Sequence, residues 1–339
     1  MAEKALSVDY TPLAQTTEIR ILNLEQGTYK DPVVCTLCPV LRSEAKYHAL
    51  SYEWGDEGDD DPSIIVTNRP VQIRRNLYEA LKRIRKPSDD IQLWVDAICI
   101  NQSDIQEKNY QVAMMGKTFA DATGFISWLG PVEDDSDLAM DLMSNSKELE
   151  ANLSSYYGES RELKSLTSLC YRLYWRRVWI IQELYLAQSY EVWCGATYIP
   201  DEEFEKSLAV LNAWITPFTQ ELGRNPANQH RTARLVRDLS FNYLRRWIWV
   251  CFRGGFQCSR EQDFIYALLN ISEEYKDGEM TFKVDYAKSP REVFLGLVQD
   301  RPTLWSEGSK DRWFTLARMM NLQIDEDLTR SVLAYYSTK

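Results

Sequence analysis

Residues 92–100 read QLWVDAICI, and this run is apolar nearly throughout. Such a run is typical of a strand that is buried on both faces of a parallel sheet. A second apolar run, GFISWL at residues 124–129, ends at Gly130-Pro131. Residues 104–121 lie between the two runs and carry apolar side chains at helical spacing. A strand, a helix and another strand in this order predict an α/β fold with a mainly parallel sheet.

The same alternation continues on both sides of this unit. Before it, the pattern predicts strands at residues 18–24, 33–41 and 47–54, a hairpin at 63–73, and a helix that Asn76 caps. After it, the pattern predicts helices from residues 137 and 164, a helix at 176–188, a strand at 190–194 and a helix from 201. Later segments, such as residues 264–271 and 290–300, are also helical in pattern. We therefore expect an α/β domain over residues 1–200, with helices flanking the sheet, and a mostly helical C-terminal region over residues 201–339 packed on it.

The charge balance excludes several classes of protein. Among 339 residues, 39 lysines and arginines stand against 50 acidic residues, which gives a formal net charge of −11. Sequence-independent binding to nucleic acid or to an anionic membrane needs a net positive face, so neither is expected. The first residues lack the apolar segment of a secretory signal, and the longest apolar run, at about residues 247–252, is far too short to span a membrane. Together with an odd number of scattered cysteines, seven in all, this predicts a cytoplasmic protein with reduced thiols.

Several familiar active-site chemistries do not fit the sequence. Histidine occurs only at positions 48 and 230, which excludes a histidine-rich metal site, and no nucleophile-elbow pattern is present. The Cys35-x-x-Cys38 pair has no second pair and is better explained as thiols of a buried strand. The Gly116-Lys117-Thr118 triplet lacks the upstream glycine of a phosphate-binding loop. We therefore expect neither a bound metal nor a cofactor.

Three segments place polar residues just beyond predicted strand ends, where α/β folds form their sites. The first is residues 49–56, ALSYEWGD. Ser51, Tyr52 and Trp54 crowd the end of the strand, and Gly55 permits a sharp exit of the chain. The alternative is a turn at the end of a strand with an ordinary core tryptophan.

The second segment follows the buried run at residues 92–100. Asp96 interrupts that run, and a carboxylate buried without a partner is costly. Asn101 follows at the turn from strand to helix, and Glu107 lies on the next helix. A hydrogen bond from Asp96 to nearby backbone is the structural alternative, and a capping box formed with Asp104 is the alternative for Glu107.

The third segment is the predicted helix around residues 178–187, which is apolar nearly all round. Glu183 is one of its two strongly polar residues and shares a helix stripe with Trp179. A carboxyl group in such dry surroundings has a raised pKa unless a cation, here Arg176 or Arg177, offsets the effect. A buried ion pair that ties this helix to the sheet is the alternative.

These segments, in this order, resemble the heterokaryon-incompatibility (HET) domain of filamentous fungi. The family's blocks "Y-x-A-L-S-Y-x-W-G", "L-W-x-D-A-I-C-I-N-Q-x-D-x-x-E…Q-V…M", "W-L-G" and "R-x-W-x-x-Q-E…A…C-G" correspond to residues 47–55, 93–115, 128–130 and 176–195. The motif core is therefore residues 47–195. Residues 260–286 look like the segment that often follows this domain, although SREQD stands at 259–263 where Asp-x-Arg-Asp is usual.

The resemblance implies a role in regulated cell death when genetically different hyphae fuse. It also implies a fold distantly similar to the TIR domain, a flavodoxin-like α/β unit. Residues 178–184, VWIIQEL, look like the TIR helix "W-C-x-x-E-L", with Ile180 in place of the cysteine. The glutamate of that motif cleaves NAD in catalytic TIR domains, and its position here is Glu183.

The residues fit such chemistry. One carboxylate near the ribose can stabilise the positive charge that develops when nicotinamide leaves, and we expect Glu183 to be that carboxylate. We expect Trp54 and Tyr52 to stack on the nicotinamide or adenine ring of the substrate, Trp179 to lie beside Glu183 in the substrate-binding site, and Arg176 or Arg177 to meet the pyrophosphate. The residues expected to complete the substrate-binding site are Ser51, Gly55, Asp96, Asn101 and Glu107. In this interpretation NAD(P)+ is a substrate and not a cofactor.

A second interpretation belongs to another class of protein. The chain is then a non-catalytic signalling module that triggers cell death through self-association and protein–protein contacts, and the polar residues at the strand ends bind a partner or build the fold. A third, weaker interpretation is an enzyme that acts on another nucleotide or glycoside. For activation we expect a homo-oligomer and a protein partner of an incompatibility system.

Overall fold

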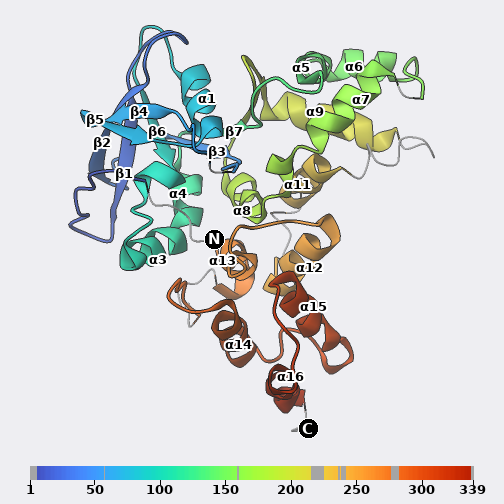
Figure 1. Cartoon of the computed structure of the whole chain (residues 1–339). Helices are drawn as coiled ribbons and strands as arrows, with labels where there is room; N and C mark the ends of the chain where they lie inside the picture. The colour runs from blue at the N-terminus through green and yellow to red at the C-terminus, as the bar shows by residue number, and fades with distance from the viewer. Residues whose placement is uncertain are drawn as a thin grey trace.

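The computed structural model of the chain describes residues 6–56, 58–158, 160–214, 225–235, 237, 242–275 and 282–336. Residues 1–5, on which part of the expectation of no signal peptide rests, lie outside these ranges, as do parts of the expected helical region such as 215–224. The described part forms a nine-stranded sheet in the order β5-β4-β2-β1-β6-β3-β7-β8-β9. Helices surround this sheet and continue to the C-terminal end (Figure 1).

Four neighbouring strands form a parallel centre. They are β6 (Ile91–Val95), β3 (His48–Tyr52), β7 (Gly124–Trp128) and β8 (Glu191–Cys194). Leu93 and Trp128 are 0% exposed, because helices cover both faces of these strands. The two apolar runs that predicted a parallel unit are therefore β6 and β7.

The two sides of the sheet are largely antiparallel, so the sheet is mixed and not mainly parallel. The strand β1 (Glu18–Leu24) pairs antiparallel with both β6 and β2 (Val34–Leu41). The strand β2 pairs parallel with β4 (Ser63–Val66), and two hairpins, β4–β5 (Arg69–Gln72) and β8–β9 (Thr197–Pro200), close the edges. Short loops join β1 to β2, β4 to β5 and β8 to β9, and such loops favour antiparallel pairs.

Three local expectations need correction. The strand at 92–100 ends at Val95, and α2 (Asp96–Cys99) follows it as a single helical turn. The helix expected at 104–121 is divided at Met114 into α3 (Ile105–Ala113) and α4 (Met115–Asp121). The helix α1 (Arg75–Ile84) starts after Arg74, and Asn76 lies inside it, where its side chain binds Glu53 and Trp128 instead of capping.

The rest of the described chain is mainly helical. Its α-helices are α5 (Ser136–Met143), α6 (Ser146–Leu153), α7 (Arg161–Cys170), α8 (Val178–Leu186), α9 (Asp201–Ala213), α11 (Pro226–Leu235), α12 (Leu244–Gly254), α13 (Asp263–Leu269), α14 (Pro290–Asp300), α15 (Asp311–Met319) and α16 (Glu326–Leu333). None of the described helices has the length and apolar character that crossing a membrane requires.

Helix α8 joins the sheet to the C-terminal helices. It packs against α4 on the sheet side and against α11 and α13 on the other (Figure 1). Asn270 donates a hydrogen bond of 2.9 Å to the Gln182 side chain, which is fully buried within α8. The helix is apolar nearly all round because both of its sides face protein.

Candidate functional site

A cleft of about 270 Å³ opens at the carboxyl ends of β3 and β6. Residues from the turns after both strands, from α3, from the start of α8 and from the segment before α13 form its walls. Its charged and aromatic lining side chains are Glu53, Trp54, Asp56, Arg74, Asp96, Lys108, Arg177, Trp179, Arg260, Asp263 and Tyr286. This is the edge at which α/β sheets bind ligands, as the strand ends predicted.

Five of the predicted site residues line this cleft. They are Trp54, Gly55, Asp96, Arg177 and Trp179. Within the described part of the chain, the other six lie elsewhere: Ser51, Tyr52, Asn101, Glu107, Arg176 and Glu183. The three sequence segments thus meet at one site. Only some of the expected side chains lie in it.

Trp54 and Asp96 form one side of the cleft. The Trp54 Nε1 donates to Asp96 Oδ2 at 3.0 Å, which holds the indole of the β3 turn against the β6 turn. Arg74 lies over the indole, 5.3 Å from a ring centroid, and donates to the carbonyl of Gly55 at 2.7 Å. Gly55 has φ +70°, a left-handed conformation that glycine adopts without strain, so the chain turns sharply here as expected.

Arg177 connects the start of α8 to the end of β3. Its Nη1 donates to the carbonyl of Tyr52. The Tyr52 side chain is only 2% exposed, so it does not offer a ring for stacking. Side chains alternate between the two faces of a strand, and Tyr52 points into the core.

Glu183 lies in the interior, 3% exposed. Ser51 donates its hydroxyl hydrogen to Glu183 Oε2, and Tyr174 in turn donates to Ser51 Oγ at 3.1 Å. Burial raises the pKa of Glu183 to about 7, against the opposing effects of the Arg177 charge and the Ser51 hydrogen bond. The charge of Asp96 raises this pKa further. Arg177 and Asp96 both line the cleft, so two cleft charges act on the buried Glu183 carboxyl, which does not itself line the cleft.

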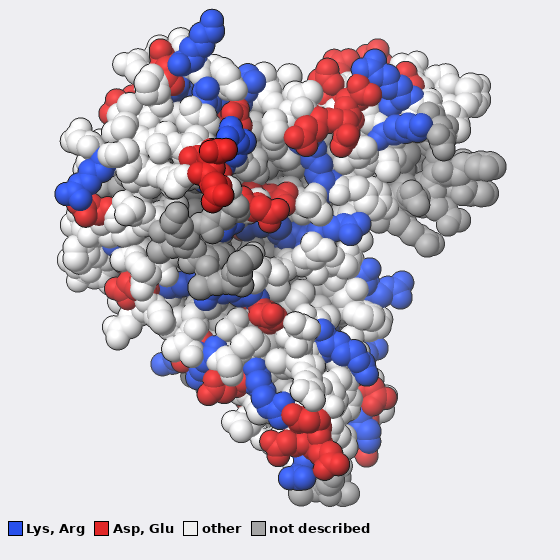
Figure 2. All heavy atoms as spheres, viewed as in Figure 1, with Lys and Arg blue, Asp and Glu red and all other residues white. Residues whose placement is uncertain are grey.

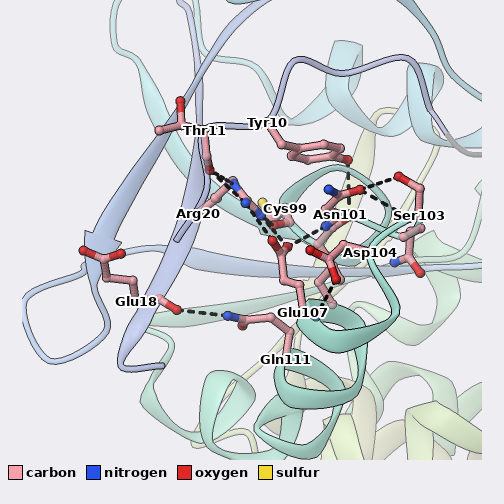
Figure 3. Close-up of polar contacts among 12 residues, drawn as sticks. Tyr10, Thr11, Glu18, Arg20, Cys99, Asn101, Ser103, Asp104, Glu107 and Gln111 are labelled. Atoms are coloured by element: carbon pink, nitrogen blue, oxygen red, sulfur yellow. Dashed lines mark hydrogen bonds and ion pairs between the residues drawn. The ribbon is translucent and has the colours of Figure 1, made fainter. Parts of the chain in front are cut away.

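Glu107 has a structural partner instead of a place in the cleft. The Arg20 guanidinium donates to both of its carboxylate oxygens, at 2.5 and 2.8 Å, and is itself 1% exposed (Figure 3). The backbone N–H of Asn101 donates to the same carboxylate at 2.8 Å. Glu107 and Asn101 therefore hold the turn between α2 and α3, and they do not form a substrate wall. Arg20 carries the sequence signal for this pair, because it is a lone cation in an apolar strand.

Arg176 also lies outside the cleft. Its guanidinium carbon is 5.9 Å from the centroid of the Tyr171 ring. Its Nε is buried, and the described residues offer it no hydrogen-bond acceptor. Its backbone carbonyl accepts a hydrogen bond of 2.7 Å from Gln257. The expected contact of Arg176 with a pyrophosphate is therefore not supported by its position, whereas Arg177 lines the cleft.

Comparison with known proteins adds the family. A family model described as Heterokaryon incompatibility protein (HET) matches residues 47–183. The chain carries a HET domain. The chain is similar to Heterokaryon incompatibility protein 6, OR allele, of Neurospora crassa, at 33% identity over 144 residues. That alignment covers 38% of this chain and 21% of the relative, so the chain spans about a fifth of the relative's length. No solved structure matches the chain.

One wall of the cleft comes from outside the HET match. Asp263, at the start of α13, accepts hydrogen bonds from Trp179 Nε1 at 3.0 Å and from the Tyr286 hydroxyl at 2.6 Å. Burial raises the pKa of Asp263, against both hydrogen bonds. Sequence reasoning missed these two residues, although the charged run at 259–263 before an apolar helix was a usable signal.

The described residues show no metal centre. Among them, no group of three or more histidine, cysteine or acidic side chains is placed to hold a metal ion. The cleft instead combines two indoles, several cations and several carboxylates. Such a set suits a ligand with a flat ring, hydroxyl groups and negative charge.

Proposed function

We propose that the chain acts in heterokaryon incompatibility as an effector of regulated cell death. In this proposal it hydrolyses the bond between nicotinamide and ribose in NAD(P)+, bound in the cleft. The observation that carries the proposal is the cleft at the carboxyl ends of β3 and β6, whose lining residues Arg177 and Asp96 act by their charge on the buried Glu183 carboxyl of pKa about 7. The HET domain and the name of its Neurospora crassa relative support the biological role.

The reaction needs little acid catalysis. The bond between the ribose C1′ and the nicotinamide nitrogen breaks, and its electron pair neutralises the cationic ring as nicotinamide leaves. Water then adds to the ribose C1′ and releases a proton. The transition state carries positive charge on the ribose, which a nearby carboxylate stabilises.

Two carboxylates have places in this chemistry. Asp96 lines the cleft at the end of β6, where the Trp54 indole orients it. Glu183 takes the catalytic role that the TIR likeness implies, and it exchanges its hydrogen bond from Ser51 for one from a ribose hydroxyl. The Trp54 and Trp179 rings flank the ligand, and Arg177 faces its diphosphate. We place this activity in the cytoplasm and expect self-association on activation.

A second candidate function rests on the burial of Glu183. This side chain is 3% exposed and accepts a hydrogen bond from Ser51. It is not among the described residues that line the cleft. A glutamate with a purely structural task has the same surroundings. The HET domain is in that case a signalling module that triggers cell death through contacts between proteins.

Release of nicotinamide separates the two candidates. The purified chain is incubated with NAD+ or NADP+ and compared with Glu183→Gln and with Glu150→Gln, a control on the exposed side of α6. We expect turnover by the parent and the control, and a loss of at least about a hundredfold in Glu183→Gln.

The fold of each variant is checked by circular dichroism. No turnover by the parent, even at concentrations where light scattering shows self-association, contradicts the hydrolase and supports the signalling module. If Glu183→Gln releases nicotinamide as fast as the parent, Glu183 has no role in the reaction.

A further inference from the structure

One side of helix α12 carries aromatic and basic side chains at the surface. The helix packs on α13 and α15, and its Trp247 is fully buried. Trp249 and Phe252 are 38% and 46% exposed, and their ring centroids are 5.2 Å apart. Arg245 and Arg253 are exposed as well. Positions 245, 249, 252 and 253 lie on one face of a helix, and we call these four residues the α12 stripe.

The composition of the α12 stripe is typical of a surface that binds another protein. Aromatic residues and arginine are enriched in protein interfaces and supply many of their hot spots. A further cation adjoins the stripe, because the Arg312 Cζ lies 4.9 Å from a ring centroid of Trp249. Residues 239–260 carry four arginines and no acidic residue. The α12 stripe therefore fits a partner surface that is acidic and also offers apolar side chains.

The chain itself has a surface of this complementary kind. Residues 131–150, which include the loop after β7 and all of α5, carry seven acidic residues and one lysine. Glu133, Asp137 and Asp141 are exposed. Val132 in the same loop and Tyr198 on β9 are 51% and 50% exposed, and α5 packs against β9. Acidic and apolar side chains thus neighbour one another, and we call these five residues the acidic surface.

The two surfaces lie apart in one copy of the chain. Helices α5 and α12 are well separated in Figure 1, and Figure 2 shows acidic side chains gathered over α5 and α6 and basic side chains beside α12. A contact between the two surfaces therefore needs two copies of the chain. It is a head-to-tail contact, which leaves one surface of each kind free for the next copy.

The net charge of the chain favours this contact over others. At a net charge of −11, two copies repel one another unless positive charge on one faces negative charge on the other. The α12 stripe and the acidic surface bring opposite charges together, and each also brings apolar side chains that the contact removes from water.

We propose that the α12 stripe of one copy binds the acidic surface of a second copy, so that the chain assembles head to tail. This contact gives the self-association expected on activation two defined surfaces. Among the described residues that line the cleft, none belongs to either surface. The inference therefore stands whether or not the cleft hydrolyses NAD(P)+.

Two variants, each with one surface changed, test the contact. Phe252→Ser with Arg253→Ser removes half of the α12 stripe, and Asp137→Lys with Asp141→Lys reverses the charge of the acidic surface. Size-exclusion chromatography with light scattering measures the mass of the full chain over a range of concentrations, without NAD+. We expect the parent to form dimers and larger species that dissociate as the salt concentration rises, and each variant to need at least about tenfold higher concentration to associate.

An equimolar mixture of the two variants shows whether the contact is head to tail. One variant keeps the acidic surface and the other keeps the α12 stripe, so we expect the mixture to form dimers and nothing larger. The controls are Lys117→Ser and Glu44→Lys, which change the charge at exposed positions outside both surfaces and associate as the parent does. Circular dichroism checks the fold of each variant. If Phe252→Ser with Arg253→Ser does not fold, Arg245→Ser with Arg253→Ser replaces it and leaves both rings in place.

Several outcomes overturn the contact. They are a parent that stays monomeric, association that strengthens as salt rises, a variant that associates as the parent does, and a mixture that forms no dimers. Assembly of the parent without nicotinamide release keeps the contact and overturns the hydrolase. Nicotinamide release by a parent that stays monomeric does the reverse.

Discussion

At the residue scale, burial makes the protonated and ionised forms of the Glu183 carboxyl similar in free energy near neutral pH. Its pKa rises from an ordinary value of 4.5 to about 7 on folding. Between these two values the folded chain holds a proton that the unfolded chain releases. The free energy of unfolding therefore falls as pH rises through this window, and it is constant above it.

The prediction is a pH dependence that Glu183→Gln removes. The parent loses up to about 3 kcal/mol of stability between pH 4.5 and 7 through this group, because each pKa unit corresponds to about 1.4 kcal/mol. The variant has no carboxyl to ionise there, and its amide keeps a hydrogen bond to Ser51. Urea unfolding at pH 5 and pH 8 measures the difference. If the free energy of unfolding depends on pH in the same way for the parent and Glu183→Gln, the raised pKa is contradicted. The control is Glu150→Gln, which shows how the loss of an exposed carboxylate changes this pH dependence.

Ionisation at this position also links stability to function. A carboxylate that is half ionised near neutral pH can stabilise positive charge only in its ionised fraction. The proposed reaction needs the ionised Glu183 carboxylate, and ionising this buried group lowers the free energy of unfolding. Such a conflict between stability and charge is common at functional sites.

At the element scale, the ion pair between Arg20 and Glu107 fastens β1 to α3. The Arg20 side chain is 1% exposed and that of Glu107 is 12% exposed. Arg20 also donates to the carbonyls of Thr11 and Cys99, so one guanidinium joins four segments of chain. The pair thereby positions the turn that carries Asp96 and Gln102 into the cleft.

We predict that Glu107→Gln lowers the free energy of unfolding by about 3–5 kcal/mol, because it leaves a buried guanidinium without its counter-charge. The double variant Arg20→Met with Glu107→Leu loses less than the sum of its two single variants. Urea unfolding measures the parent, Glu107→Gln, the two single variants and the double variant. The control is Asp135→Asn, which breaks an exposed ion pair with Arg161 and costs at most about 1 kcal/mol. Additive losses in the double variant argue that the two side chains act independently.

Elements that depend on local pattern are predicted well from the sequence. The strand at residues 18–24 and the helix at 290–300 match β1 and α14. Hydrophobic period and capping residues decide such elements, and both are visible in a short window. The short strand β9 was missed, because its four residues carry no clear period before the helix that begins at Asp201.

The candidate site is predicted less completely, because its partners lie far apart along the chain. Arg20 and Glu107 are separated by 87 residues, and Trp179 and Asp263 by 84. Periodicity locates polar residues at strand ends, but it does not show whether a carboxylate meets a cation or opens to a cleft. Glu107 and Asp96 have similar sequence settings and different surroundings for this reason.

At the scale of the whole molecule, α8 belongs to two packing interfaces at once. It packs against α4 beside the sheet and against α13 of the C-terminal region. The cleft is likewise built from both parts, through Trp179 and Asp263. We propose that the sheet and the helices after residue 200 unfold as one cooperative unit.

Leu268→Ala tests this coupling. Leu268 is 0% exposed in α13, so its truncation costs about 2–5 kcal/mol in lost burial and a cavity. Hydrogen exchange then reports the same loss of protection in β3 and β7 as in α13, because all three open in one transition. Leu235→Ala, at a position 59% exposed on α11, changes protection by no more than about 0.5 kcal/mol. Unchanged protection of β3 and β7 in Leu268→Ala shows instead that the α/β part and the helical part unfold separately, with a boundary near residue 200.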